Sequence, residues 1–168
     1  SRILETYADL RNADVVVVTL GLTETWFDSV DQIHINRSPG GYRKLMKLGG
    51  RYQYFNDNPL SVIETVDDII AEIRSQTSGR AKIVITTSPV PMRATWDNRD
   101  VVLANLFSKS TLLSAATFAA SKYDYVDYFP SYELVTYSNR EDTWKDDGVH
   151  IKAPLVSQVI EKIGRAHV

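Results

Sequence analysis

Asp147 and His150 are the residues whose types and spacing most directly suggest chemistry, and they stand in the segment DDGVH at residues 146–150. On a turn that enters a helix, a separation of three residues brings both side chains to one side. A histidine placed in this way takes a proton from a hydroxyl group, while the aspartate fixes its tautomer and stabilises the imidazolium. The alternative is a turn with a partly exposed histidine, because Asp-Gly is a common turn dipeptide and helix N-termini favour acids.

The segment GLTE, residues 21–24, is the second candidate, because it directly follows an apolar run. Gly21 lets the backbone turn and approach a ligand. The hydroxyl of Thr23 is a donor for a developing oxyanion. We therefore expect Asp147 to accept a hydrogen bond from Nδ1 of His150, with Nε2 facing a cleft that also contains Gly21 and Thr23. The alternative is an ordinary strand-to-loop turn in which Thr23 and Glu24 cap a short helix.

Ser88 lies at the end of another predicted strand, in the segment SPVP. A nucleophile fits such a position, but the flanking prolines favour a stiff, extended segment and not the tight glycine turn of a nucleophile elbow. We therefore interpret Ser88 as a residue of the pocket wall and keep a nucleophile as the alternative. The histidines at positions 34, 150 and 167 lack metal-ligand spacing, so no metal is expected.

Alternating helices and strands must position these residues. The four valines at positions 15–18 are apolar and β-branched, which is typical of a central parallel strand covered on both faces. Residues 83–87 and 125–128 predict two further strands. Predicted helices lie at 2–12, 58–80 and 101–123 and from Pro154 onward. In the second of these, Pro59 suits the first turn, and Ser61 with Glu64 forms a possible capping box.

This order predicts βαβ units, and hence an α/β fold with a mainly parallel sheet and helices on both of its faces. In open sheets of this kind, ligands bind beyond the carboxyl ends of the strands. Three segments leave those ends, namely LGLTETW, TTSPVPM and YFPSYE, and DDGVH is placed to reach the same edge. Residues 27–58 are rich in glycine, asparagine and aromatic residues and predict an irregular insertion, and such insertions often line a site or carry a small hairpin.

Composition limits the function classes. The 168 residues fit a single domain, with 43% hydrophobic residues and a formal net charge of −2. Nothing electrostatic therefore suggests nucleic acid or an anionic membrane as a partner. No run of 18 apolar residues is present, so no transmembrane segment is expected. Cysteine is absent, which excludes disulfides and thiolate sites and fits a cytoplasmic location. No cofactor is expected.

Five segments together resemble one family. LGLTETW, TTSPVPMRATW, ANLFSKSTLLSAA, VDYFPSYELV and DDGVHI are similar, in order and rough spacing, to those of the GSCFA domain family. That family looks like a branch of the SGNH, or GDSL-like, hydrolases. The resemblance runs from about Asp14 to about Ile163. It implies a three-layer α/β/α sandwich and ester chemistry. Asp147 and His150 match the D-x-x-H block of SGNH enzymes. The G-x-N-D block falls on residues 21–24, with Thr23 where asparagine is expected.

The SGNH block that carries the nucleophilic serine has no match, because the chain contains no GSCFA or GDS motif. We therefore expect a C-terminal portion of a longer protein, a sheet without its first strand, and an exposed edge open to self-association. The expected function is ester hydrolysis or acyl transfer on small or carbohydrate-linked acyl esters, with the serine upstream. The alternative is a catalytically inactive module that binds a glycan or a protein partner.

Overall fold

The computed structural model describes residues 8–35, 38–40 and 47–167, and these residues form two three-stranded sheets. The larger sheet holds β1 (Val15–Leu20), β5 (Lys82–Thr87) and β6 (Val126–Phe129), in the order β1-β5-β6. Both pairings are parallel, as the three apolar runs predict. Residues 8–12 of the first predicted helix are helical, and its earlier part lies outside the described residues.

One face of this sheet packs against two long helices, α3 (Pro59–Gln76) and α4 (Val101–Lys122). Alternate residues of β1 point to this side, so Val16 and Val18 pack on the core together with Ile83 and Ile85 of β5. Leu20 and Val126 belong to the same cluster, and the two helices contribute its other buried side chains, which are Val62, Val66, Ile70, Ile73, Leu112, Ala115, Ala116 and Ala119.

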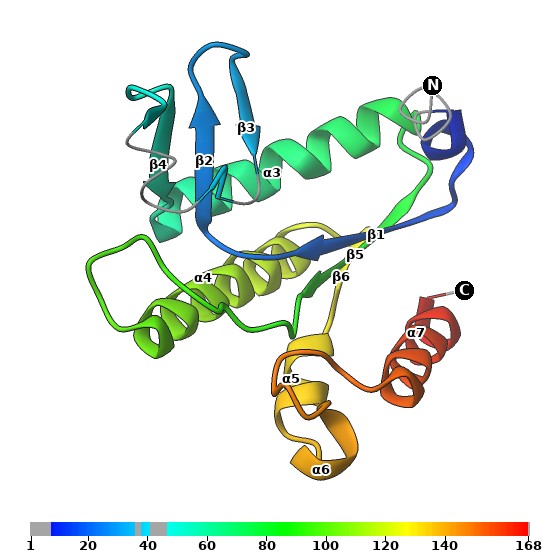
Figure 1. The fold of residues 1–168 in the computed structure, drawn as a ribbon. Coiled ribbons are helices and arrows are strands. Elements are labelled where there is room, and N and C mark those ends of the chain that lie inside the picture. The colour runs from blue at the N-terminus through cyan, green and yellow to red at the C-terminus, as the bar shows by residue number, and fades with distance from the viewer. Residues whose placement is uncertain (1–7, 36–37, 41–46, 168) are drawn as a thin grey trace.

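The opposite face is covered by α5 (Ser131–Thr136) and α7 (Ala153–His167). Figure 1 shows α7 on the other side of the strands from α3. Val17 and Thr19 of β1 face an apolar groove of about 270 Å³ that is also lined by Val135 of α5 and Val159 of α7. Helices therefore cover both faces of a parallel sheet, and the predicted α/β sandwich is confirmed.

The start of α3 differs in one detail from the prediction. Asn58 is its N-cap, and its side-chain oxygen accepts hydrogen bonds from the backbone N–H groups of Leu60 and Ser61. Pro59 takes the first helical position, as predicted. Ser61 does not cap the helix, because its hydroxyl donates to the carbonyl of Asn58. The helix therefore starts one turn before the N-cap position predicted at Ser61, and the capping box predicted at Ser61 and Glu64 is wrong.

The second sheet forms where an irregular insertion was expected. Its strands are β2 (Glu24–Asp28), β3 (Ile33–Ile35) and β4 (Tyr52–Asn56), paired antiparallel in the order β3-β2-β4. Aromatic side chains hold it together, since the ring of Trp26 packs 5.4 Å from that of Tyr54 and 5.2 Å from that of Trp96. The segment predicted as an irregular insertion thus contributes β3, β4 and the end of β2 to a small sheet.

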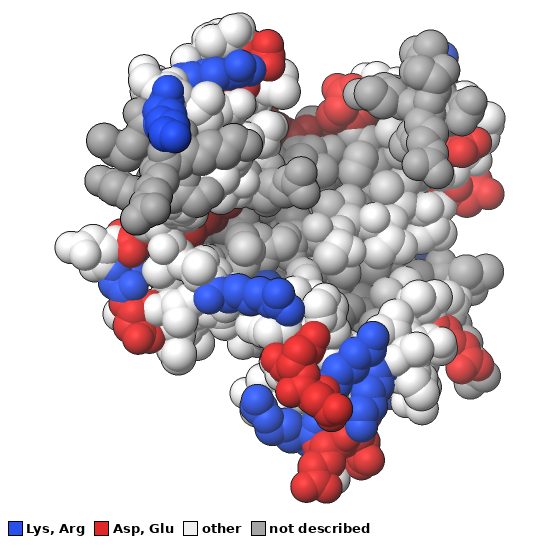
Figure 2. Space-filling model, in the orientation of Figure 1, with Lys and Arg blue, Asp and Glu red and all other residues white. Residues whose placement is uncertain are grey.

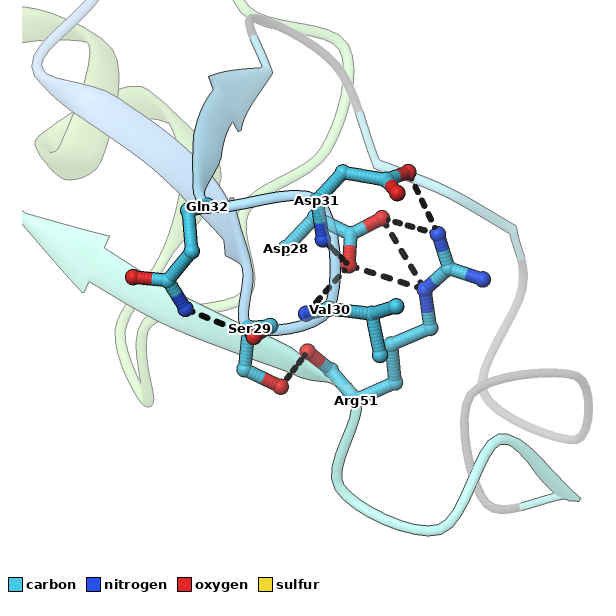
Figure 3. Close-up of polar contacts among 6 residues, drawn as sticks. All are labelled: Asp28, Ser29, Val30, Asp31, Gln32 and Arg51. Carbon is cyan, nitrogen blue, oxygen red and sulfur yellow. Dashed lines mark hydrogen bonds and ion pairs between the residues drawn. The ribbon is translucent and has the colours of Figure 1, made fainter.

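An ion pair between a buried carboxylate and a half-buried guanidinium closes the β2–β3 turn of this second sheet (Figure 3). Asp28 is only 3% exposed, and Nη2 of Arg51 lies 2.6 Å from its Oδ2. The backbone N–H groups of Val30 and Asp31 donate to the same carboxylate. The guanidinium hydrogen bond, with these N–H groups, holds the pKa of Asp28 well below its usual range.

Helix α4 is apolar around most of its circumference. Of the described helices, it alone is long and apolar enough to cross a membrane by length and composition. Its buried residues, among them Leu112 and Ala116, belong to the core against the larger sheet. Within the apolar part of α4, 39% of the residues are buried in the fold.

Candidate functional site

The segment that holds Asp147 and His150 is a closed turn between α6 (Arg140–Thr143) and α7. Trp144 and Ile151 pair as an antiparallel bridge at its base. Inside the turn, the backbone N–H of Lys145 donates to the carbonyl of His150 at 2.8 Å. Gly148 at the tip has a φ of +65°, a conformation that favours glycine. These backbone contacts fix the position of the histidine before α7 begins.

The Asp147–His150 pair has the hydrogen bond that the spacing predicts. Oδ2 of Asp147 lies 2.5 Å from Nδ1 of His150. Oδ1 of the same carboxylate accepts the backbone N–H groups of Val149 and His150, at 3.0 and 2.9 Å. With its proton on Nδ1, the imidazole donates to the carboxylate and keeps Nε2 free as a base. The catalytic role of the pair stays a prediction.

The electrostatic environment of Asp147 stabilises its charged form. The hydrogen bond with His150 is the main cause, and with the backbone donors it holds the pKa of Asp147 well below its usual range. Nη2 of Arg93, from the loop after β5, lies 3.9 Å from Oδ2. The side chains of Asp147 and His150 are 42% and 58% exposed. The pair is therefore on the surface, where Figure 2 shows charged side chains of both signs gathered around α6.

The turn meets the carboxyl ends of the parallel strands. Besides the Arg93 contact, Ile151 lines the apolar groove together with Thr19 of β1, Thr86 of β5 and Pro89. Two observations are thus consistent with the prediction that DDGVH reaches this edge of the sheet: the Arg93–Asp147 contact, and the groove that Ile151 shares with the strand ends. Within the described ranges, His150 has no hydroxyl group within hydrogen-bonding distance, and its one side-chain hydrogen bond is to Asp147.

Gly21, Glu24 and Ser88 line a different cavity, of about 260 Å³. The carbonyl of Gly21 accepts a hydrogen bond from Nζ of Lys109 at 2.9 Å. The hydroxyl of Ser88 accepts the backbone N–H of Val90 at 3.3 Å. The structure therefore brings three of the predicted pocket residues together. Neither Asp147 nor His150 lines this cavity.

Thr23 is buried, with 2% of its surface exposed. Its hydroxyl donates to Oδ1 of Asn56 at 2.7 Å, and its backbone N–H donates to Oγ of Ser108 at 2.9 Å. A hydroxyl has a single proton, so an oxyanion would have to compete with Asn56 for it. In this geometry Thr23 joins β4 and α4 to the loop after β1. The shared cleft with His150 and the oxyanion role stay predictions.

Sequence reasoning missed Ser108 and Lys109, two adjacent residues that are 0% and 1% exposed. They hold both ends of the loop after β1, because Lys109 binds Gly21 and Ser108 binds Thr23. The sequence feature that could have indicated them is SKS at residues 108–110, a polar segment within a mostly apolar helix. A lysine is rarely buried without a specific role.

Metal ligands do not cluster in the part of the chain that the structure describes, where no group of three or more His, Cys, Asp or Glu residues is placed to hold an ion. A family model described as the GSCFA family matches residues 1–163. No curated protein sequence matches the chain.

Proposed function

The chain belongs to the GSCFA family, and we propose that it supplies the acid–base part of an SGNH-type ester hydrolase or acyl transferase. The observation that carries this proposal is the 2.5 Å contact between Nδ1 of His150 and Oδ2 of Asp147. An aspartate oriented in this way favours the tautomer in which Nε2 accepts a proton from a hydroxyl nucleophile. The substrates would be small or carbohydrate-linked acyl esters, by analogy with the family.

The nucleophilic serine would come from a strand that is not among the described ones. Two features support this placement. Among the described strands β1 pairs with β5 alone, so one of its edges has room for a further strand. An apolar groove lies on one face of this sheet, lined by Val17 and by α7, and it reaches Ile151, the residue after His150. A serine at the carboxyl end of such a strand would lie at the same sheet edge as the imidazole.

Turnover of a chromogenic acetyl ester tests the proposal, with protein that carries the upstream serine. His150→Ala should lower turnover by about 10⁶-fold, because base and nucleophile act as a unit. His34→Ala is the matched control, since His34 packs on Phe27 in the second sheet, and it should leave turnover unchanged. The 168-residue chain alone should show almost no turnover. Equal turnover by wild type and His150→Ala would contradict the proposed role of the turn.

A second candidate function is a binding module without catalysis. The surface position of Asp147 and His150, and the lack of a hydroxyl beside the imidazole in the described residues, favour it. Such a module would bind a glycan or a protein partner and would show no His150-dependent turnover even with the upstream segment present. Turnover by the 168-residue chain that Ser88→Ala abolishes would instead place the nucleophile at Ser88 and remove the need for a further strand.

A further inference from the structure

Lys109 carries a buried amino group. It lies in α4 with 1% of its surface exposed, and burial lowers its pKa to about 8. Its amino group carries up to three N–H donors, and the carbonyl of Gly21 accepts one of them. Among the residues that the structure describes, no carboxylate lies within 4.0 Å of its nitrogen. A buried cation in this state gains free energy from any anion that reaches it.

The cavity beside Lys109 gives an anion that access. Its volume is about 260 Å³, and Leu22, Val90 and Pro91 make its walls largely apolar. It opens where the chain leaves β1 at Gly21 and β5 at Ser88, which is the edge where open parallel sheets bind ligands. The residues around an occupant therefore include one lysine, one glutamate, one serine and several apolar side chains.

We propose that this cavity binds the carboxylate of a small organic acid, with the amino group of Lys109 holding the carboxylate and the apolar walls covering a short aliphatic chain. The site is separate from the Asp147–His150 turn, because neither of these residues lines the cavity. It also gives Lys109 a role beyond its hydrogen bond to Gly21.

The charges around the cavity favour a monoanion over phosphate or sulfate. Lys109 is the cation of the lining, and Glu24 is its anion. The carboxylate of Glu24 is turned to other partners, since it accepts from the hydroxyl of Thr95 and from the backbone N–H of Trp96. Its charge nevertheless opposes a second negative charge in so small a volume. Phosphate sites use several donors or a guanidinium, and the lining contains no arginine.

Butyrate is the probe, with butyramide as its uncharged isostere and sulfate as a dianion, all at constant ionic strength and pH 7. Binding to the 168-residue chain is followed by the shift of its melting temperature. Butyrate should stabilise the wild type, and Lys109→Met should weaken its binding by about 10-fold or more, the effect of losing one charged hydrogen bond. Lys82→Met is the matched control, because Lys82 is an exposed lysine at the start of β5, and it should bind as the wild type does.

NMR of the wild-type chain with ¹³C-labelled lysine keeps the test valid even where Lys109→Met does not fold. Butyrate should shift the Cε signal of Lys109 and move its titration midpoint upward, because a nearby anion favours the ammonium form. An unchanged Lys109 signal in saturating butyrate would overturn the proposal. Equal stabilisation by butyramide or by sulfate would overturn it too, as would unaltered butyrate binding by folded Lys109→Met.

Discussion

Nδ1 of His150 lies 2.5 Å from Oδ2 of Asp147, and the other oxygen of that carboxylate accepts two backbone N–H groups of the same turn. Three donors thus converge on one half-exposed carboxylate. They stabilise its charged form, which places the pKa of Asp147 below its usual range. The turn is therefore held together by the ionised state of Asp147.

The first prediction concerns the acid stability of this turn. Because the pKa of Asp147 is lower in the folded chain than in the unfolded chain, its contribution is present above pH of about 4 and is lost as the pH falls through the folded value. The Cγ signal of Asp147 in ¹³C NMR should stay that of a carboxylate below pH 4. His150→Gln should move its midpoint upward, and His34→Ala should not. If the titration midpoint of Asp147 does not move in His150→Gln, the backbone donors alone are enough to lower the pKa of Asp147.

The second prediction ranks the two residues in turnover. Asp147 would orient and stabilise the imidazole without taking the proton, so Asp147→Ala should cost less than His150→Ala. In a triad enzyme the orienting aspartate is worth about 10⁴-fold and the base about 10⁶-fold. The measurement is ester turnover by protein that includes the upstream serine. A larger loss for Asp147→Ala than for His150→Ala would assign the two residues other roles.

The third prediction separates two roles of Thr23. Its hydroxyl donates to Asn56, whose amide in turn donates to Asp97. Thr23→Val leaves Oδ1 of Asn56 without this donor, so the free energy of unfolding should fall by about 1–3 kcal/mol. Thr23→Ser keeps the hydroxyl and should retain most of the stability. A Thr23→Val variant of wild-type stability whose ester turnover falls by about 10²-fold would instead support the oxyanion role.

Elements with a strong local pattern were predictable from the sequence, and β1 shows why. Four β-branched valines predict a parallel strand, and β1 does pair in parallel with β5. The predicted central position with cover on both faces is wrong for the described strands, because β1 lies at the edge of the sheet and Val17 is 47% exposed. The second sheet was not predictable in the same way, because β3 is only three residues long and β2 mixes polar with aromatic residues. Its strands are specified by pairing and by aromatic packing across the sequence.

In the candidate site, too, contacts between residues close in sequence were predictable and contacts between distant residues were not. The Asp147–His150 hydrogen bond depends on residues three apart, so its spacing predicted it. The partners of Thr23 and Lys109 could not be read in this way, because they lie 33 and 88 residues away. Contacts of such separation depend on how α4 and β4 meet the loop after β1, and single-sequence patterns do not report that packing.

The fourth prediction concerns the ion pair of the second sheet. Arg51→Met leaves the buried carboxylate of Asp28 without its cation, so the melting temperature should fall clearly. The double variant Asp28→Asn with Arg51→Met removes both charges and should recover most of the loss. Arg80→Met is the control, because its pair with Asp14 is exposed and should contribute little. A loss in Arg80→Met as large as that in Arg51→Met would contradict the argument from burial.

The last prediction follows from the burial of Lys109. Its pKa is about 8 in the folded chain, against 10.5 for an ordinary lysine. Between these two values the unfolded chain binds more protons than the folded chain, so folding becomes more favourable as the pH rises. Below pH of about 8 both states carry the proton, and the cost of burying the charge is present in full. Lys109→Met has no such group and therefore no such dependence.

The measurement is urea unfolding of wild type and Lys109→Met at several pH values from about 7 to about 10.5. The wild type should gain stability relative to Lys109→Met across this window, by up to roughly 3 kcal/mol, because one pKa unit corresponds to about 1.4 kcal/mol. Groups that titrate in both proteins cancel when the unfolding free energy of Lys109→Met is subtracted from that of the wild type. The control Lys82→Met should show the same pH dependence of stability as the wild type. Butyrate binding should weaken over the same window, since Lys109 loses the charge that holds the carboxylate. A constant stability difference across the window would show that Lys109 does not titrate there.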